Sequence, residues 1–119
     1  MHTIKIKIQV SNGNQIAFGP GKAKLLEAIL EFGSMAAAAK SMKMSYKRAW
    51  DLVMVMNASF KQPLVSTTIG GYNGGGTTLT LTGQLVLNRY REILKESEQF
   101  VTTQMTTFIP LLASESDSD

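Results

Sequence analysis

Hydrophobic and polar residues alternate strictly at the start of the chain. Isoleucine or valine stands at every second position of residues 4–10, and lysine or glutamine stands between them. This period of two is typical of a half-buried strand, so we predict a β-strand over residues 4–10. A turn signal, Asn12-Gly13-Asn14, and a short apolar run at residues 15–18 follow, and together they predict a β-hairpin.

The pattern changes to a helical period after residue 19, and Pro20 is suited to the first position of a helix. One apolar stripe then runs to about residue 32, at Leu25, Leu26, Ile29, Leu30 and Phe32. Gly33 is placed to end this helix, and Ser34 is placed to cap the next one, which carries four consecutive alanines.

A short turn at residues 42–44 leads to a third predicted helix, which Ser45 caps and which runs to about Ala58. The inward positions of this helix are Ala49, Leu52 or Val53, and Met56. Its opposite side carries Tyr46, Lys47, Trp50 and Met54. Small alanine side chains let the neighbouring helix approach closely, so the two helices predict a helix-turn-helix. In that motif the second helix can enter the major groove of DNA.

A second hairpin is predicted after Pro63, which ends the helical run. The β-branched residues 64–69 and the segment 77–81 predict two strands, and the glycine-rich residues 70–76 predict a flexible tip.

We expect Thr82 to cap a long fourth helix that runs from Gly83 towards Phe108. Its apolar positions recur at helical spacing, at Val86, Tyr90, Ile93, Val101, Met105, Phe108 and Leu112. The stripe skips a turn at Ser97, where a kink or a break would lie.

Composition narrows the function classes. The 119 residues form one domain with an ordinary core, and no apolar run approaches the roughly 18–20 residues that span a bilayer. Without cysteine the chain has no disulfide and no thiolate nucleophile, and His2 is its only histidine. We therefore expect a cytoplasmic protein that is not an enzyme, does not contact a membrane and holds neither a metal nor a cofactor.

Charge is distributed unevenly. Residues 1–61 hold nine basic and three acidic side chains, whereas residues 82–119 hold three basic and six acidic ones. A basic half attracts phosphate groups, and this favours a nucleic-acid partner. Lysines spread over a solvated surface explain the same charge equally well.

The predicted order is three helices, a two-stranded hairpin and a fourth helix, which is the order of a winged helix-turn-helix. The fold class is therefore α+β, with an N-terminal hairpin and a long C-terminal helix. Short strings over about residues 4–95 make the pattern more specific. They are Gly19-Pro20-Gly21, Leu25-Leu26-Glu27-Ala28-Ile29, Gly33-Ser34, Ala38-Ala39-Lys40, Met44-Ser45-Tyr46-Lys47-Arg48-Ala49-Trp50-Asp51, Met56-Asn57, Pro63-Leu64-Val65, Gly70-Gly71-Tyr72-Asn73-Gly74-Gly75-Gly76, Leu79-Thr80 and Gly83.

These strings resemble the N-terminal DNA-binding domain of the ModE molybdate-responsive regulators. The resemblance implies a winged-helix fold related to the LysR-type DNA-binding head, and a dimer that binds a palindromic operator. Three features differ from the family pattern. The chain has no room for the family's C-terminal molybdate-binding domains, so we expect no molybdate sensing of that kind and leave the effector open. Tyr72 and Asn73 stand where such wings often carry a basic residue, and the helix after Lys95 does not resemble the family's linker.

Candidate DNA-binding residues follow from these elements. Lys47 and Arg48 lie in the first turn of the third helix and suit base edges or flanking phosphates. The hydroxyls of Ser45 and Tyr46 suit a phosphate, and Trp50 suits the core or an interface as well as a groove. The full set of DNA-binding candidates is Ser34, Lys40, Lys43, Ser45, Tyr46, Lys47, Arg48, Trp50, Thr67, Tyr72 and Asn73. Asp51 stands at helical spacing from Lys47 and Arg48, where it can orient either cation, and an ordinary surface ion pair explains its position equally well.

The fourth helix extends beyond the predicted head, and a monomer would expose its apolar stripe. We therefore predict a homodimer with Tyr90, Ile93, Val101, Met105 and Phe108 at its interface. The predicted domain organisation is a winged-helix domain at residues 1–95, a helical extension for dimerisation at 96–113, and an acidic disordered tail at 114–119.

The sequence thus predicts a dimeric transcriptional regulator that binds double-stranded DNA. Two alternatives stay open: an interaction partner of a separate regulator, and an oxyanion or nucleotide sensor that uses the glycine-rich loop. The loop lacks the Gly-Lys-Ser/Thr ending of a nucleotide-binding P-loop, which disfavours the nucleotide site.

Overall fold

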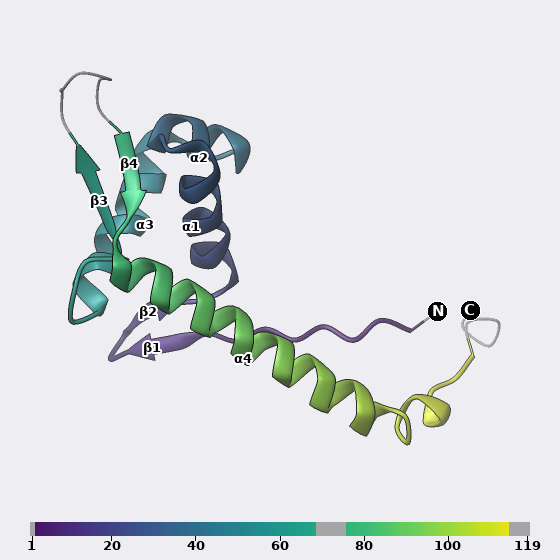
Figure 1. The fold of residues 1–119 in the computed structure, drawn as a ribbon. Helices are drawn as coiled ribbons and strands as arrows, with labels where there is room; N and C mark the ends of the chain where they lie inside the picture. Colours follow the sequence, from purple (N-terminus) through teal and green to yellow (C-terminus); the bar gives the residue numbers. More distant parts are fainter. Residues whose placement is uncertain (1, 69–75, 115–119) are drawn as a thin grey trace.

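A computed structural model describes residues 2–68 and 76–114 of the chain. Three helices pack around one core, a hairpin lies on each side of them, and a long fourth helix runs away from the body (Figure 1). The helices are α1 (Pro20–Phe32), α2 (Met35–Ser41), α3 (Tyr46–Ser59) and α4 (Leu81–Met105), followed by the 3₁₀ turn η1 (Ile109–Leu111). The strands are β1 (Val10–Asn12), β2 (Gln15–Phe18), β3 (Val65–Thr68) and β4 (Gly76–Leu79). The predicted α+β winged-helix class is confirmed.

None of the described helices is long and apolar enough to cross a membrane.

Local capping sets the boundaries of the first three helices as predicted. Pro20 opens α1, and Gly33 ends it in the left-handed conformation with φ 66°. The hydroxyl oxygen of Ser34 accepts the amide of Ala37 at 3.3 Å, and that of Ser45 accepts the amide of Arg48 at 3.0 Å. These bonds satisfy amide groups that the first turn of a helix cannot pair internally.

The core lies where α1, α2 and α3 meet, and β4 and the first half of α4 close it. Its largest fully buried side chains are Phe18, Leu25, Leu26, Ile29, Val53, Met56, Leu64 and Leu87. Leu30 and Phe32 are exposed, so the buried stripe of α1 is narrower than the predicted one. Arg91 on α4 pairs with Glu27 on α1 at 3.1 Å, which adds a polar contact at the edge of this core.

The predicted strand over residues 4–10 is wrong except at its last residue, because β1 begins at Val10. A strand needs a paired neighbour, and β2 is only four residues long, so no strand lies beside residues 2–9. Side-chain burial nevertheless alternates along this segment. Ile4, Ile6 and Ile8 are half-buried, whereas the lysines between them are exposed. The hydroxyl of Tyr90 on α4 donates to the carbonyl of Ile8 at 2.8 Å and anchors the end of this segment.

The second hairpin is anchored to the helices through main-chain atoms. β3 and β4 pair antiparallel, with Val65 opposite Leu79. The amide of Thr77 donates to the carbonyl of Gly33 at 3.0 Å, and the amide of Thr80 donates to the carbonyl of Leu64 at 2.9 Å. The hairpin therefore has a fixed orientation relative to the α1–α2 turn.

Thr80, not the predicted Thr82, caps α4. Its hydroxyl oxygen accepts the amide of Gly83 at 2.9 Å, and the same hydroxyl donates to the carbonyl of Pro63 at 2.6 Å. This second bond comes from a distant segment, so a local pattern does not reveal which threonine is the cap. From Leu81 to Met105 α4 is one helix, without the break that the skipped turn at Ser97 allowed.

The side chain of Asn57 joins α3 to the start of the second hairpin. Its carbonyl oxygen accepts the amides of Leu64 at 2.8 Å and Val65 at 3.2 Å, and its amide group donates to the carbonyl of Val65 at 3.2 Å.

We expect Asn57→Ala to lower the free energy of unfolding by about 1–3 kcal/mol, because it leaves partly buried main-chain groups without partners. Urea unfolding measures this loss. Asn88→Ala, at an exposed position of α4, is the matched control and should stay within about 0.5 kcal/mol of the wild type. Equal effects of the two changes would contradict the role of Asn57.

Candidate nucleic-acid interface

The outer face of α3 is exposed along its length. Ala49, Val53 and Met56 are buried on its inner face, as the sequence predicted. Lys47, Asp51 and Met54 follow one another at intervals of four and three residues, so they share the outer face. The ammonium of Lys47 lies 3.0 Å from a carboxylate oxygen of Asp51, and both side chains are exposed. Lys47 thus lies midway between the two flanks of the outer face, in the first turn of the helix.

The two flanks of α3 differ in chemistry. Arg48 lies on the flank away from the second hairpin, where it lines a hollow together with Leu52 and residues of the α2–α3 turn. Lys7 and Lys22 line the same hollow, so this flank gathers three cations. Lys22 donates to the carbonyl of Ile16, and burial lowers the pKa of its ammonium from the ordinary value for lysine.

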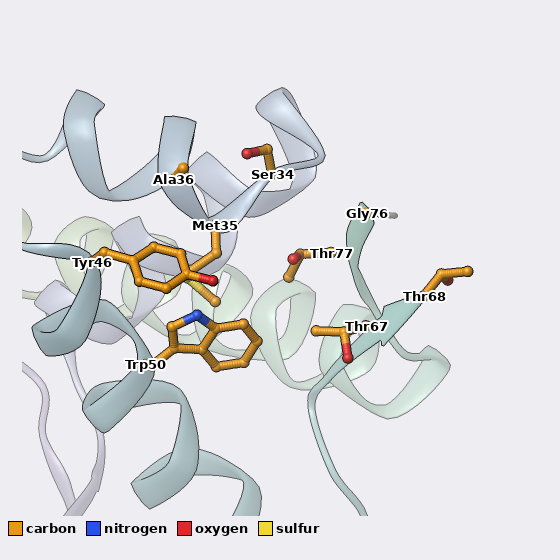
Figure 2. Close-up of a pocket in the computed structure, with 9 residues that line it drawn as sticks. All are labelled: Ser34, Met35, Ala36, Tyr46, Trp50, Thr67, Thr68, Gly76 and Thr77. Atoms are coloured by element: carbon orange, nitrogen blue, oxygen red, sulfur yellow. The ribbon is translucent and has the colours of Figure 1, made fainter. Parts of the chain in front are cut away.

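The other flank of α3 forms a second hollow with α2 and the second hairpin, which we call the wing hollow (Figure 2). Its volume is about 380 Å³, and its lining residues are Ser34, Met35, Ala36, Tyr46, Trp50, Thr67, Thr68, Gly76 and Thr77. The rings of Tyr46 and Trp50 meet edge to face, with centroids 6.2 Å apart and planes 79° apart. Of the described residues that line the wing hollow, none is charged.

The structure brings four of the predicted DNA-binding residues together in the wing hollow, namely Ser34, Tyr46, Trp50 and Thr67. The oxygen of Ser45 is engaged in the cap of α3. Tyr72 and Asn73 lie outside the described residues.

Two further predicted DNA-binding lysines lie at the turn between α2 and α3. Lys40 is exposed in the last turn of α2, and Lys43 lies in the turn itself with φ 56°. Sequence reasoning missed this left-handed conformation, since lysine is not a residue that signals it. It also missed Met35, Thr68 and Thr77 as neighbours of Trp50, because they come from separate segments.

The predicted dimer residues divide into two groups. Tyr90 is 7% exposed and packs on Phe18 with ring centroids 5.0 Å apart, so it belongs to the core of its own protomer. Ile93 and Phe108 are exposed, and Val101 and Met105 are half-buried. The sequence analysis missed Leu85, which is 68% exposed, although its spacing of eight residues from Ile93 is a helical one.

No group of three or more His, Asp or Glu side chains in the described parts of the chain could hold a metal ion.

Comparisons with known proteins match the N-terminal parts of several regulators. No family model matches the chain. It is 34% identical to the transcriptional regulator ModE of Haemophilus influenzae over 99 residues, which are 83% of this chain and 38% of that protein. It is 43% identical to the molybdenum transport protein ModE of Azotobacter vinelandii over 77 residues, which are 65% of this chain and 28% of that protein. The predicted resemblance to ModE regulators is confirmed. The chain spans less than two fifths of the length of these ModE relatives.

Solved structures share the winged-helix fold with this ModE-like chain. The DNA-binding domain in the crystal structure of the CbnR_DBD–DNA complex superimposes with a TM-score of 0.55 and 24% identity, over 73% of this chain and 94% of that one. The LysR family transcriptional regulator VV2_1132 superimposes with a TM-score of 0.55 and 19% identity, over 78% of this chain and 30% of that one. At these identities the likeness concerns the fold.

Proposed function

We propose that this chain is a DNA-binding transcriptional regulator of the ModE type and that α3 enters the major groove. The observation that carries the proposal is the outer face of α3, which is exposed and has Lys47 at its centre. A helix in this setting, capped by Ser45 and supported from behind by α2, matches the recognition helix of a helix-turn-helix. The ModE names of the relatives and the DNA in the CbnR_DBD complex support the same function.

The position of each cation on α3 supports a separate proposed role. Lys47 points outward at the centre of the exposed face, so it reaches base edges once it leaves Asp51. Arg48 lies on a flank among further cations, so it contacts the phosphates of one strand. Lys40 and Lys43 lie beside α3 and hold the backbone on either side of the groove.

We expect Lys47→Ala to relax the preference for one base pair, by about 1–3 kcal/mol of discrimination. Arg48→Ala should instead weaken binding to all duplexes alike and lower the slope of log affinity against log salt by about one. Titration of each variant against duplexes with single base changes separates the two effects. Identical profiles for the two variants would contradict these roles.

A second copy of the chain is the proposed partner in the dimer. Leu85, Ile93 and Phe100 form an exposed apolar stripe along one side of α4, beside the face that packs on the core. Arg89 lies between the first two of them, and exposed apolar side chains gathered on one side of a helix favour an interaction site. Two copies related by a twofold axis would present two α3 helices to a palindromic operator, about one helical turn or a multiple apart.

Selection of bound duplexes from a random pool tests the proposed function and reports the symmetry of the site. A salt titration of the selected duplex then measures the phosphate contribution, and log affinity should fall linearly with log salt. Binding that is indifferent to salt, or no duplex binding at low salt, would favour the alternative of an interaction partner for a separate regulator.

A further inference from the structure

Hydrogen-bond donors without protein partners converge on the wing hollow. Figure 2 shows the indole nitrogen of Trp50 and the hydroxyl of Tyr46 turned towards its middle, with the hydroxyl of Thr77 across from them. Within the described residues, none of these three groups makes a hydrogen bond to the protein. The indole N–H can only donate, so the hollow offers its polar groups to a ligand with acceptor oxygens.

The remaining lining of the wing hollow is more apolar than polar, although Ser34, Thr67 and Thr68 also belong to it. The ring of Trp50 and the side chains of Met35 and Ala36 form its walls, and its volume of about 380 Å³ lies at the small end of ligand pockets. A ligand that fits must therefore combine acceptor oxygens with a small apolar body. The phosphate and deoxyribose of one nucleotide have this combination.

Because the described lining carries no charge, it favours a nucleotide within a strand over a free phosphate ion. A free phosphate would lose water and gain no Coulomb attraction from the described lining residues, so its binding would be weak. A strand phosphate loses water in the same way, but the cations that hold the strand elsewhere on the protein offset that cost. Lys47 is the neighbour of Tyr46 in the chain and supplies such a cation on the outer face of α3.

The position of the hollow indicates which part of the DNA backbone would reach it. It lies between α3, which on the proposed function reads the major groove, and the second hairpin, which lies beside it. We propose that one sugar–phosphate unit of the DNA backbone occupies the wing hollow. The unit belongs to the strand that borders the major groove entered by α3, on the side that faces the second hairpin. Trp50 Nε1 and the Tyr46 hydroxyl donate to its phosphate oxygens, and the indole face packs on its deoxyribose. This inference rests on the proposed function.

Removal of one donor at a time tests the site. Trp50→Phe and Tyr46→Phe keep an aromatic ring and remove one donor each, and we expect each to weaken binding to the selected duplex by about tenfold, as for the loss of a hydrogen bond to a charged group. Thr103→Val is the control, since it also removes one hydroxyl but lies near the far end of α4 (Figure 1). It should bind the duplex like the wild type.

A scan with methylphosphonates then locates the phosphate. Neutralising one particular phosphate in each half-site should weaken the wild type by about tenfold or more, the Trp50→Phe protein by less, and the double variant Trp50→Phe/Tyr46→Phe least, whereas the other phosphates affect all three proteins alike. Trp50 is the only tryptophan, so its indole N–H gives a single resonance that reports on the hollow. This resonance should shift with the intact duplex and not with the duplex that carries the neutral phosphate.

The outcomes show whether the proposed site fails alone or together with the proposed function. If the wild type binds the duplex but shows the same phosphate profile as Trp50→Phe, the site is wrong and the function stands. If the wild type binds no duplex, both are wrong. A shift of the indole resonance by millimolar phosphate or molybdate alone would make the hollow an ion site and overturn the inference.

Discussion

Gly83→Ala is expected to destabilise the fold more than any other single substitution proposed for this chain. A Cβ atom at this position would lie 2.1 Å from the carbonyl oxygen of Leu64, which is far inside any allowed contact. The oxygen belongs to the main chain at the start of the second hairpin, where it also accepts the amide of Thr80. Neither group can move without separating α4 from the hairpin. We therefore expect a loss of about 3 kcal/mol or more, at the upper end of the cost of overpacking.

Thermal unfolding measures this effect, and the midpoint should fall by about 10–20 °C. Gly21→Ala is the matched control, because Gly21 lies in α1 with no heavy atom near its missing Cβ. Alanine there should stabilise the chain by about 0.5–1 kcal/mol. A Gly83→Ala protein that unfolds within a few degrees of the wild type would show that α4 does not approach Leu64 this closely.

Phe100→Glu is expected to convert the proposed dimer into a monomer. Phe100 is 67% exposed, and it shares one side of α4 with Ile93. The same side continues into an apolar groove lined by Val10, Phe18, Phe60, Leu85, Val86, Arg89, Tyr90 and Ile93. A carboxylate within a contact between two such stripes would be buried without a partner, at a cost larger than most interfaces tolerate. Sedimentation should therefore report half the wild-type mass.

Loss of the dimer should also change DNA binding, and the pattern of that change distinguishes a folded monomer from a misfolded protein. Two linked heads gain about 10²–10⁴ in avidity over one head. The Phe100→Glu protein should lose at least about 100-fold in affinity for the palindromic duplex and bind a single half-site like the wild type. Thr102→Glu adds the same charge on the opposite side of α4 and should leave the mass and both affinities unchanged. A dimer that survives Phe100→Glu would place the interface elsewhere.

Local signals predicted most of the fold. Ser34, Ser45 and Gly33 act within one turn of their own helices, and the structure confirms all three. The strand at residues 4–10 failed because alternation reports burial, and a strand also requires a neighbour that pairs with it. Thr82 failed because the bond from Thr80 to Pro63 comes from a distant segment.

The candidate site was predicted in part for the same reason. The exposed side of α3 follows from the helical period alone, and Tyr46, Lys47 and Met54 are exposed as predicted, whereas Trp50 is half-buried. The wing hollow was not predicted, since it combines α2, α3 and the second hairpin, and their packing is set by the core. Tyr90 was assigned to the dimer because a helical stripe does not distinguish contact with the same chain from contact with a second copy.

The bond between the amide of Thr77 and the carbonyl of Gly33 has an evolutionary consequence. Both atoms belong to the main chain, so almost any side-chain substitution in the hairpin leaves the bond in place. On the proposed function, residues on the outer face of α3 can therefore diverge towards new operator sequences while the position of the hairpin against the α1–α2 turn is inherited unchanged. The side chains proposed to contact DNA and the main-chain bond that places the hairpin belong to different segments, so the first can vary without a change in the second.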